Sequence, residues 1–180
     1  MRRGGAAAVA APALLLAAVM AAILVYSLGR DRGDARVAGR ARGDLLAGAL
    51  YAQSPAAPPL AGFGEARIAV GGRCILVGVA DARGERVRGL RGVDDLGRYG
   101  GMLFVFAQDG RGQFTMAGTT IALDVTFYDS RGTDVDRASM KPCPDGDDTS
   151  CPLYGSRGPY RFALEAPAGE LGAGVLAPCA

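Results

Sequence analysis

The sequence predicts a mainly β domain, a small β-sandwich or barrel with one short helix, that follows an N-terminal transmembrane or signal helix. An uncharged apolar run begins a few residues into the chain. Farther on, short runs of branched and aromatic residues are separated by turn-forming residues, the pattern of an all-β sandwich or barrel. The chain has 180 residues, and we expect its folded part at residues 66–180, a common domain size.

Residues 1–28 are expected to be a membrane anchor or signal segment. Arg2 and Arg3 precede Ala6–Leu28, which carries no charge and as a helix is long enough to cross about 30 Å of hydrocarbon. The alternative is a cleaved signal peptide, whose apolar region is normally about 7–15 residues long. No good A-x-A cleavage site follows Leu28. We therefore expect a single membrane span through residues 6–28, with secretion after cleavage as the alternative.

The orientation of this span follows from two opposing arguments. Five arginines lie between residues 30 and 42, more than the two that precede the span, and this count alone would keep the domain in the cytosol. Long downstream domains, however, translocate largely regardless of charge, and an even number of cysteines suits export. We expect the N-terminus inside and the domain outside the cytoplasm.

Residues 29–65 are expected to be a flexible linker. Arg, Gly, Ala and Asp dominate its first part, and Pro55–Pro59 reads PAAPP. A proline-rich segment is extended and semi-rigid. The sequence therefore predicts a tether without a packed core of its own.

The strands of the folded part are predicted by apolar runs and by alternation. In Ile121–Tyr128 apolar residues alternate with Asp124 and Thr126, which is typical of a half-buried strand. Asp129–Gly132 then supplies turn-forming residues. One segment, Ala82–Leu90, is predicted to be a short helix. The expected strands are Cys74–Val79, Met102–Phe106, Ile121–Tyr128, Thr133–Met140 and Tyr160–Ala166.

The four cysteines predict two disulfides. Cys143 and Cys151 enclose a loop of Pro, Gly and Asp, and a bridge between them is worth roughly 2.5 kcal/mol in the chain-entropy model. A Cys74–Cys179 bridge would attach the C-terminus to an early strand. Four cysteines allow three pairings, so the connectivity stays open. The spacing suits a zinc site poorly, and we expect no metal.

Composition excludes several functions. The chain has no His, so a Ser-His-Asp triad and a His-ligated metal are both excluded. Residues 66–180 carry 13 basic and 14 acidic residues, whereas nucleic-acid binders present a basic surface. We expect no nucleic-acid partner and no cofactor.

Several blocks in a fixed order resemble a known family. They read VADARGERVRGLRGVDDL, GMLFVF, FTMAGTTIALDVTFYDSRG, MKPC, CPLYG and YRFALEAPAG. Over Ile75–Gly172 the chain is similar to the domain of unknown function 192 (DUF192) family. The resemblance implies a small, jelly-roll-like, mainly β domain behind an export signal, with no established enzymatic activity. Members commonly carry Trp, Lys and Asn where this chain has Thr115, Ala117 and Gly118.

The same blocks supply five candidate ligand-binding residues. We expect Arg88 to approach the carboxylates on one side of the domain, either as a structural ion pair or as part of a ligand pocket. The candidates are Arg88, Met116, Thr119, Asp124 and Glu165.

The sequence favours a non-enzymatic envelope domain over an enzyme. We expect a monomer that binds a small molecule, a glycan or an envelope protein partner through one sheet face. The alternative is a hydrolase in which Asp124 and Glu165 share acid–base work, as paired carboxylates do in glycosidases.

Overall fold

The computed structural model describes residue 48 and residues 54–179. The predicted membrane segment Ala6–Leu28 lies outside the described residues. Within the part that is described, no helix combines the length and the apolar character needed to cross a membrane.

The described part is mainly β. All five predicted strands are present, as β3, β4, β6, β7 and β9, and the short helix α2 (Arg83–Arg88) lies within the predicted Ala82–Leu90. The strands are β1 (Ser54–Pro55), β2 (Gly64–Val70), β3 (Arg73–Ala80), β4 (Met102–Gly110), β5 (Gln113–Thr115), β6 (Leu123–Tyr128), β7 (Asp134–Met140), β8 (Leu153–Gly155), β9 (Tyr160–Pro167) and β10 (Leu176–Pro178).

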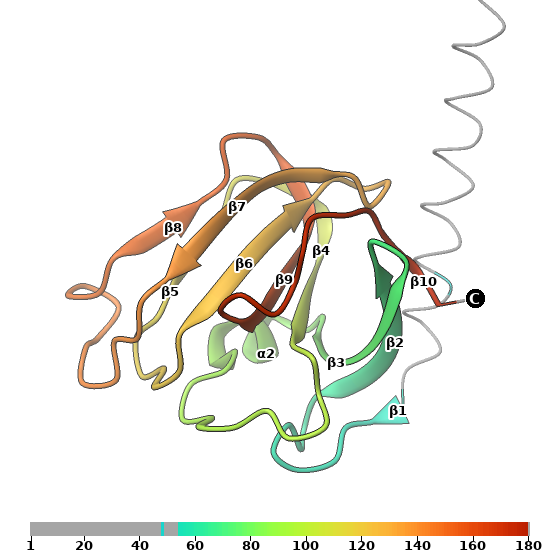
Figure 1. Ribbon diagram of the computed structural model, residues 1–180. Coiled ribbons are helices and arrows are strands. Elements are labelled where there is room, and N and C mark those ends of the chain that lie inside the picture. The colour runs from blue at the N-terminus through green and yellow to red at the C-terminus, as the bar shows by residue number, and fades with distance from the viewer. Residues whose placement is uncertain (1–47, 49–53, 180) are drawn as a thin grey trace, which may run out of the picture. The chain divides into compact units, whose positions relative to one another are not determined.

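The strands form one large mixed sheet and one small sheet (Figure 1). The large sheet has the order β1-β2-β3-β4-β9-β6-β7, and β10 also pairs with β2. β3 and β4 are parallel, with Val79 opposite Leu103, because the connection through α2 returns the chain to the same end of the sheet. The expected jelly-roll-like arrangement therefore needs correction, since a jelly roll is built of antiparallel strands.

Both faces of the large sheet are buried. Met102, Val125 and Phe127 belong to one apolar cluster, and Leu103 and Tyr128 belong to another on the opposite face. This corrects the half-buried pattern expected for β6, in which Thr126 is also buried. The sheet is curved so that one cluster lies against α2, β5 and the loop between α2 and β4 (Figure 1).

The end of the expected linker is part of the folded domain. Leu60 is fully buried, and Phe63 packs in the same cluster. The Tyr99 hydroxyl accepts a hydrogen bond from the Ala57 N–H at 2.8 Å and donates to Glu65 at 2.7 Å. The prolines stiffen this segment, but its interspersed apolar residues bury it, so the packed domain begins before residue 66.

Both predicted disulfides are formed. Cys143–Cys151 closes a local loop, and Cys74–Cys179 joins the start of β3 to the end of β10. At the other end of β10, the Leu176 N–H donates to Gly132 O at 2.8 Å. Gly132 has φ +77°, and a Cβ there would lie 2.1 Å from Leu176 O, so this contact requires glycine.

Candidate functional site

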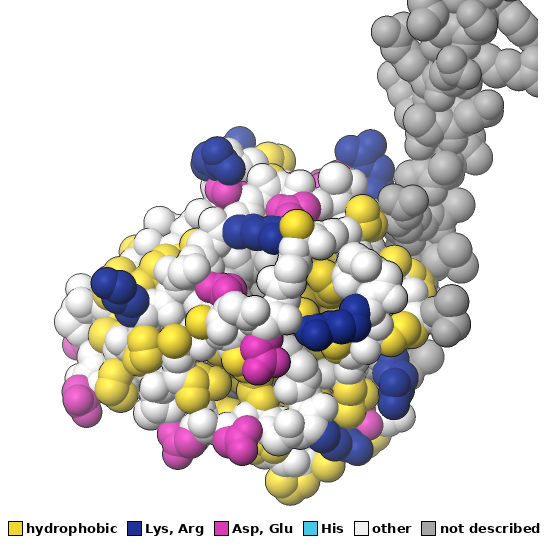
Figure 2. All heavy atoms as spheres, in the orientation of Figure 1, with side chains coloured by type: hydrophobic (Ala, Val, Ile, Leu, Met, Phe, Trp, Pro, Cys, Tyr) yellow, Lys and Arg dark blue, Asp and Glu magenta, His cyan; other side chains and the backbone are white. Residues whose placement is uncertain are grey.

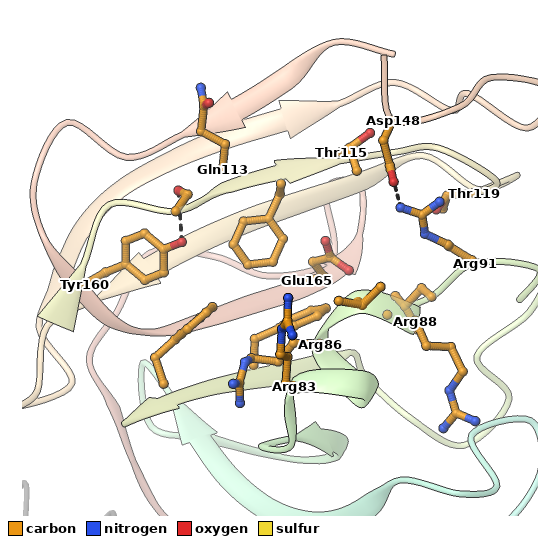
Figure 3. Close-up of a pocket in the computed structure, with 17 residues that line it drawn as sticks. Arg83, Arg86, Arg88, Arg91, Gln113, Thr115, Thr119, Asp148, Tyr160 and Glu165 are labelled. Carbon is orange, nitrogen blue, oxygen red and sulfur yellow. Dashed lines mark hydrogen bonds and ion pairs between the residues drawn. The ribbon is translucent and has the colours of Figure 1, made fainter. Parts of the chain in front are cut away.

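A cavity of about 340 Å³ lies between α2 and β5. In Figure 3, Gln113 and Thr115 lie on one side of it, Arg83 and Arg86 lie on the other, and Glu165 lies between them. We call it the α2–β5 cavity. Its polar and charged lining residues are Arg83, Arg86, Arg88, Arg91, Gln113, Thr115, Thr119, Asp148 and Glu165, and its aromatic ones are Phe104, Phe106, Phe114 and Tyr160.

The local sequence fixes α2 against this cavity. The Glu85 carboxylate accepts hydrogen bonds from the N–H groups of Asp81 and Ala82 at the start of the helix. Gly89 ends the helix with φ +50°, and its N–H donates to Glu85 O at 2.8 Å. Glycine adopts this conformation without strain, and the Phe104 ring lies close by.

Two arginines of α2 are held in different ways. Arg86 donates to Val105 O at 3.0 Å and to Asp81 O, and its guanidinium lies 5.3 Å from the centre of the Phe106 ring. The Arg88 guanidinium instead donates to Gly62 O at 2.9 Å and lies 3.7 Å from the centre of the Phe63 ring. Figure 3 shows the Arg88 side chain running away from Glu165. Arg88 therefore lines the cavity with its stem.

The disulfide loop forms one edge of the cavity. Asp148 lies between Cys143 and Cys151 and forms an ion pair with Arg91, which follows α2. Asp147 accepts hydrogen bonds from Thr149 and Ser150, and these bonds lower the pKa of Asp147 to about 2. The loop is thus ordered by its own hydrogen bonds, and it presents Asp148 to the cavity.

Aromatic rings make up the apolar part of the wall. Phe114 meets Phe104 edge to face at 5.0 Å between ring centres, and Phe106 meets Tyr160 in the same way at 5.3 Å. The Tyr160 hydroxyl donates to Gly112 O at 3.0 Å, and burial raises the pKa of Tyr160 to about 12. The aromatic wall is therefore fixed and offers mainly ring edges and faces to a ligand.

Glu165 is the most unusual group in the cavity. It lies in β9 opposite Met102 and Val125, so its side chain leaves the sheet on the face that carries those apolar residues. Its exposed fraction is 4%, and its carboxyl group has no hydrogen bond or ion pair with a described residue. Burial alone raises the pKa of Glu165 to about 8, so the carboxyl group is mostly protonated at neutral pH.

The structure brings three of the five candidate residues to the cavity. Arg88, Thr119 and Glu165 line it. Met116 does not, because its side chain is buried in the core next to the cavity. Asp124 is adjacent to Val125 in β6 and points to the opposite face of the sheet, where one of its oxygens accepts from the Gly169 N–H at 2.8 Å.

Two expectations are corrected by this geometry. Arg88 pairs with neither carboxylate, and the five residues do not share one side of the domain. Asp124 and Glu165 project from opposite faces of the sheet, because they occupy positions of opposite parity on neighbouring strands. The two carboxylates therefore cannot flank one substrate, and the hydrolase built on them is excluded.

Sequence reasoning missed most of the cavity wall. Arg83, Arg86 and Arg91 follow one another closely around α2, and this arginine-rich helix was the available signal. Phe114 gave none, because β5 is only three residues long and pairs with the equally short β8. A strand that short has no periodicity to detect.

The model of DUF192, described as "Uncharacterized ACR", matches residues 66–177, more than half of the chain. The chain belongs to the DUF192 family. Among curated proteins, none matches the chain.

Two solved structures share the fold. One is described as a putative transcription regulator from Sinorhizobium meliloti; it is 23% identical, the match covers 63% of this chain and 93% of that one, and the TM-score is 0.55. The other is a protein of unknown function from Novosphingobium aromaticivorans, 24% identical, with 66% and 84% covered and a TM-score of 0.54. At these identities the likeness shows the fold alone.

The three residues at which the resemblance implied Trp, Lys and Asn lie in different surroundings. Thr115 lines the α2–β5 cavity, whereas Ala117 is fully buried and Gly118, which has φ +70°, does not line the cavity. Of the three positions, Thr115 is the one where a larger side chain would enter the cavity.

Proposed function

We propose that this DUF192 domain is held outside the cytoplasm by its N-terminal segment and binds a small polar ligand in the α2–β5 cavity without transforming it. The observation that carries the proposal is Glu165, a buried carboxyl group without a partner that faces a cavity. Its carboxyl group is open to the cavity and is not engaged by another described side chain, so it is available to pair with a ligand there.

The size and lining of the cavity support a small ligand. A volume of about 340 Å³ falls at the lower end of the range for small-molecule sites. Apolar rings together with a few converging polar groups are the usual composition of such sites. The two disulfides support the location, because disulfides persist in oxidising compartments outside the cytoplasm.

The lining gives less support to catalysis. Among the described residues of the cavity, Asp148 is the carboxylate other than Glu165, and it is largely exposed and paired with Arg91. The chain has no His to activate a nucleophile. A binding role requires only that Glu165 and Asp148 contact a ligand from their present positions, with no acid–base pair between them.

The test fills the cavity and asks whether binding disappears. A panel of sugars and organic acids is screened for thermal stabilisation of the full-length protein, purified in mild detergent. Thr115→Trp places an indole in the cavity, and we expect this variant to lose the stabilisation that a ligand of the panel gives to the wild-type protein. Leu153→Trp is the matched control, since it introduces the same indole at an exposed position of β8 that does not line the cavity. Stabilisation by a ligand that survives Thr115→Trp would place the site elsewhere.

A further inference from the structure

We infer that the ligand of the α2–β5 cavity is an acidic sugar, a single ring that carries hydroxyl groups and one carboxylate. This inference rests on the proposed function and names its ligand class. It follows from three features of the lining: unneutralised arginines, a buried carboxyl group without a partner, and fixed aromatic rings.

The cationic side of the cavity favours an anion. Four arginines and two acidic residues line it. Arg91 is paired with Asp148, and the Arg88 guanidinium is turned to Gly62 and Phe63. Arg83 forms no ion pair with a described residue, and Arg86 donates its hydrogen bonds to backbone carbonyls. A carboxylate next to Arg83 and Arg86 would receive charge-assisted hydrogen bonds.

The buried side of the cavity favours hydroxyl groups. A protonated Glu165 can donate one hydrogen bond and accept others, which matches a hydroxyl group that also does both. Thr115 and Thr119 add further hydroxyl partners on the wall. An acid without hydroxyl groups, once Arg83 and Arg86 bind its carboxylate, would have no polar group left for Glu165.

The aromatic wall favours a ring of saturated carbons. Phe104, Phe106 and Phe114 line the cavity and are held by edge-to-face contacts with one another or with Tyr160. Rigid rings offer apolar area at little cost in conformational entropy. The C–H groups of a sugar ring can pack on that area while its hydroxyl groups reach Glu165.

The experiment compares three probes by calorimetric titration of the full-length protein in detergent. D-glucuronate has the saturated ring, the hydroxyl groups and the carboxylate. D-glucose lacks the carboxylate, and cyclohexanecarboxylate lacks the hydroxyl groups. We expect D-glucuronate to bind at least about tenfold more tightly than either, the effect of one charge-assisted hydrogen bond.

Two variants test the role of the arginine. Arg83→Gln should weaken D-glucuronate binding about fivefold to tenfold and leave D-glucose unchanged, since it removes the partner of the carboxylate alone. Arg67→Gln is the matched control, an exposed arginine of β2 that does not line the cavity. Equal effects of the two variants would overturn the inference, because only the overall charge would then matter.

The outcomes separate this inference from the proposed function. If D-glucose or cyclohexanecarboxylate binds as tightly as D-glucuronate and this binding is lost in Thr115→Trp, the acidic-sugar assignment is wrong and the cavity is still a binding site. Failure of D-glucuronate to bind also overturns the assignment. If no ligand of the wider panel binds in a manner sensitive to Thr115→Trp, the proposed function itself is wrong.

Discussion

Glu165 couples the stability of the domain to pH. Its pKa is raised by burial to about 8 in the folded protein, whereas an unfolded chain has the ordinary value near 4.5. The folded state therefore holds the proton more tightly. The contribution of Glu165 to the free energy of unfolding is fully present below about pH 4.5. It is lost as the pH rises toward 8, by at most about 1.4 kcal/mol per pH unit.

We predict that Glu165→Gln flattens this dependence. Gln keeps the shape and hydrogen-bonding capacity of the protonated acid but does not titrate. The thermal midpoint of the wild-type protein should fall relative to the variant between pH 5 and pH 8, as measured by circular dichroism of both. Parallel curves over that range would show that Glu165 ionises without penalty.

Two other groups with a shifted pKa, Asp136 and Tyr160, titrate outside this range. Hydrogen bonds from Arg157 lower the pKa of Asp136 to about 2, so stability from Asp136 is present above pH 4 and is lost only as the pH falls toward 2. The charged groups that line the cavity with Glu165 are Arg83, Arg86, Arg88, Arg91 and Asp148, and Tyr160 has its pKa raised to about 12. The difference between the wild-type protein and Glu165→Gln from pH 5 to 8 therefore isolates Glu165, because the two proteins share every other titrating group.

Single residues also mark the limit of sequence reasoning about the site. Glu165 was predicted from its place in an alternating strand, and it does line the cavity. Asp124 has the same kind of place, yet it faces away, because strand parity fixes which residues share a face only within one strand. Arg88 donates to a backbone carbonyl, Gly62 O, and a contact with the backbone cannot be predicted from a pattern of side chains.

At the scale of elements, five of the long strands were predicted, whereas the long strand β2 (Gly64–Val70) and the short strands were not. β3, β4, β6, β7 and β9 are apolar or alternating runs of at least six residues. β5, β8 and β10 have three residues each and depend on pairing with distant segments. The parallel pairing of β3 with β4 depends on the crossover through α2, which local periodicity does not report.

The two disulfides should stabilise the domain to different degrees. In the chain-entropy model a cross-link that spans more residues removes more disorder from the unfolded chain. Cys143 and Cys151 are 8 residues apart, and Cys74 and Cys179 are 105 apart. The model gives about 2.5 kcal/mol for the first and about 4.7 kcal/mol for the second.

We predict that replacing Cys74 and Cys179 by Ala lowers the free energy of unfolding more than replacing Cys143 and Cys151 does. Urea unfolding of the two double variants measures the difference. The Cys143/Cys151 variant should additionally weaken ligand binding, because its loop presents Asp148 to Arg91 at the cavity. Unchanged affinity in that variant would show that the loop holds its position without the bridge.

At the scale of the whole molecule, an apolar segment precedes a disulfide-bonded domain. Ala6–Leu28 carries no charge and follows two arginines. The arginines between residues 30 and 42 oppose export by their charge, whereas both disulfides require an oxidising compartment to persist. Buried residues of the domain begin at Ala56, and residues 29–53 separate the apolar segment from the first described strand in the sequence. If the apolar segment spans the membrane, we expect a protease outside it to reach these residues.

We predict that protease added to intact bacterial spheroplasts that express the full chain cuts this stretch and releases the domain, which immunoblotting of the membrane and soluble fractions would detect. The released fragment should resist further digestion until a reductant opens the disulfides, because these bridges tie the loop and the C-terminus to the sheet. A cytosolic marker protein, which must stay intact, controls for lysis. Full protection of the domain would mean that the arginines after the span retained it in the cytosol. Release into the medium without any protease would instead indicate a cleaved signal peptide. Neither full protection nor such release bears on ligand binding in the cavity, because both concern only the segment that precedes the folded domain.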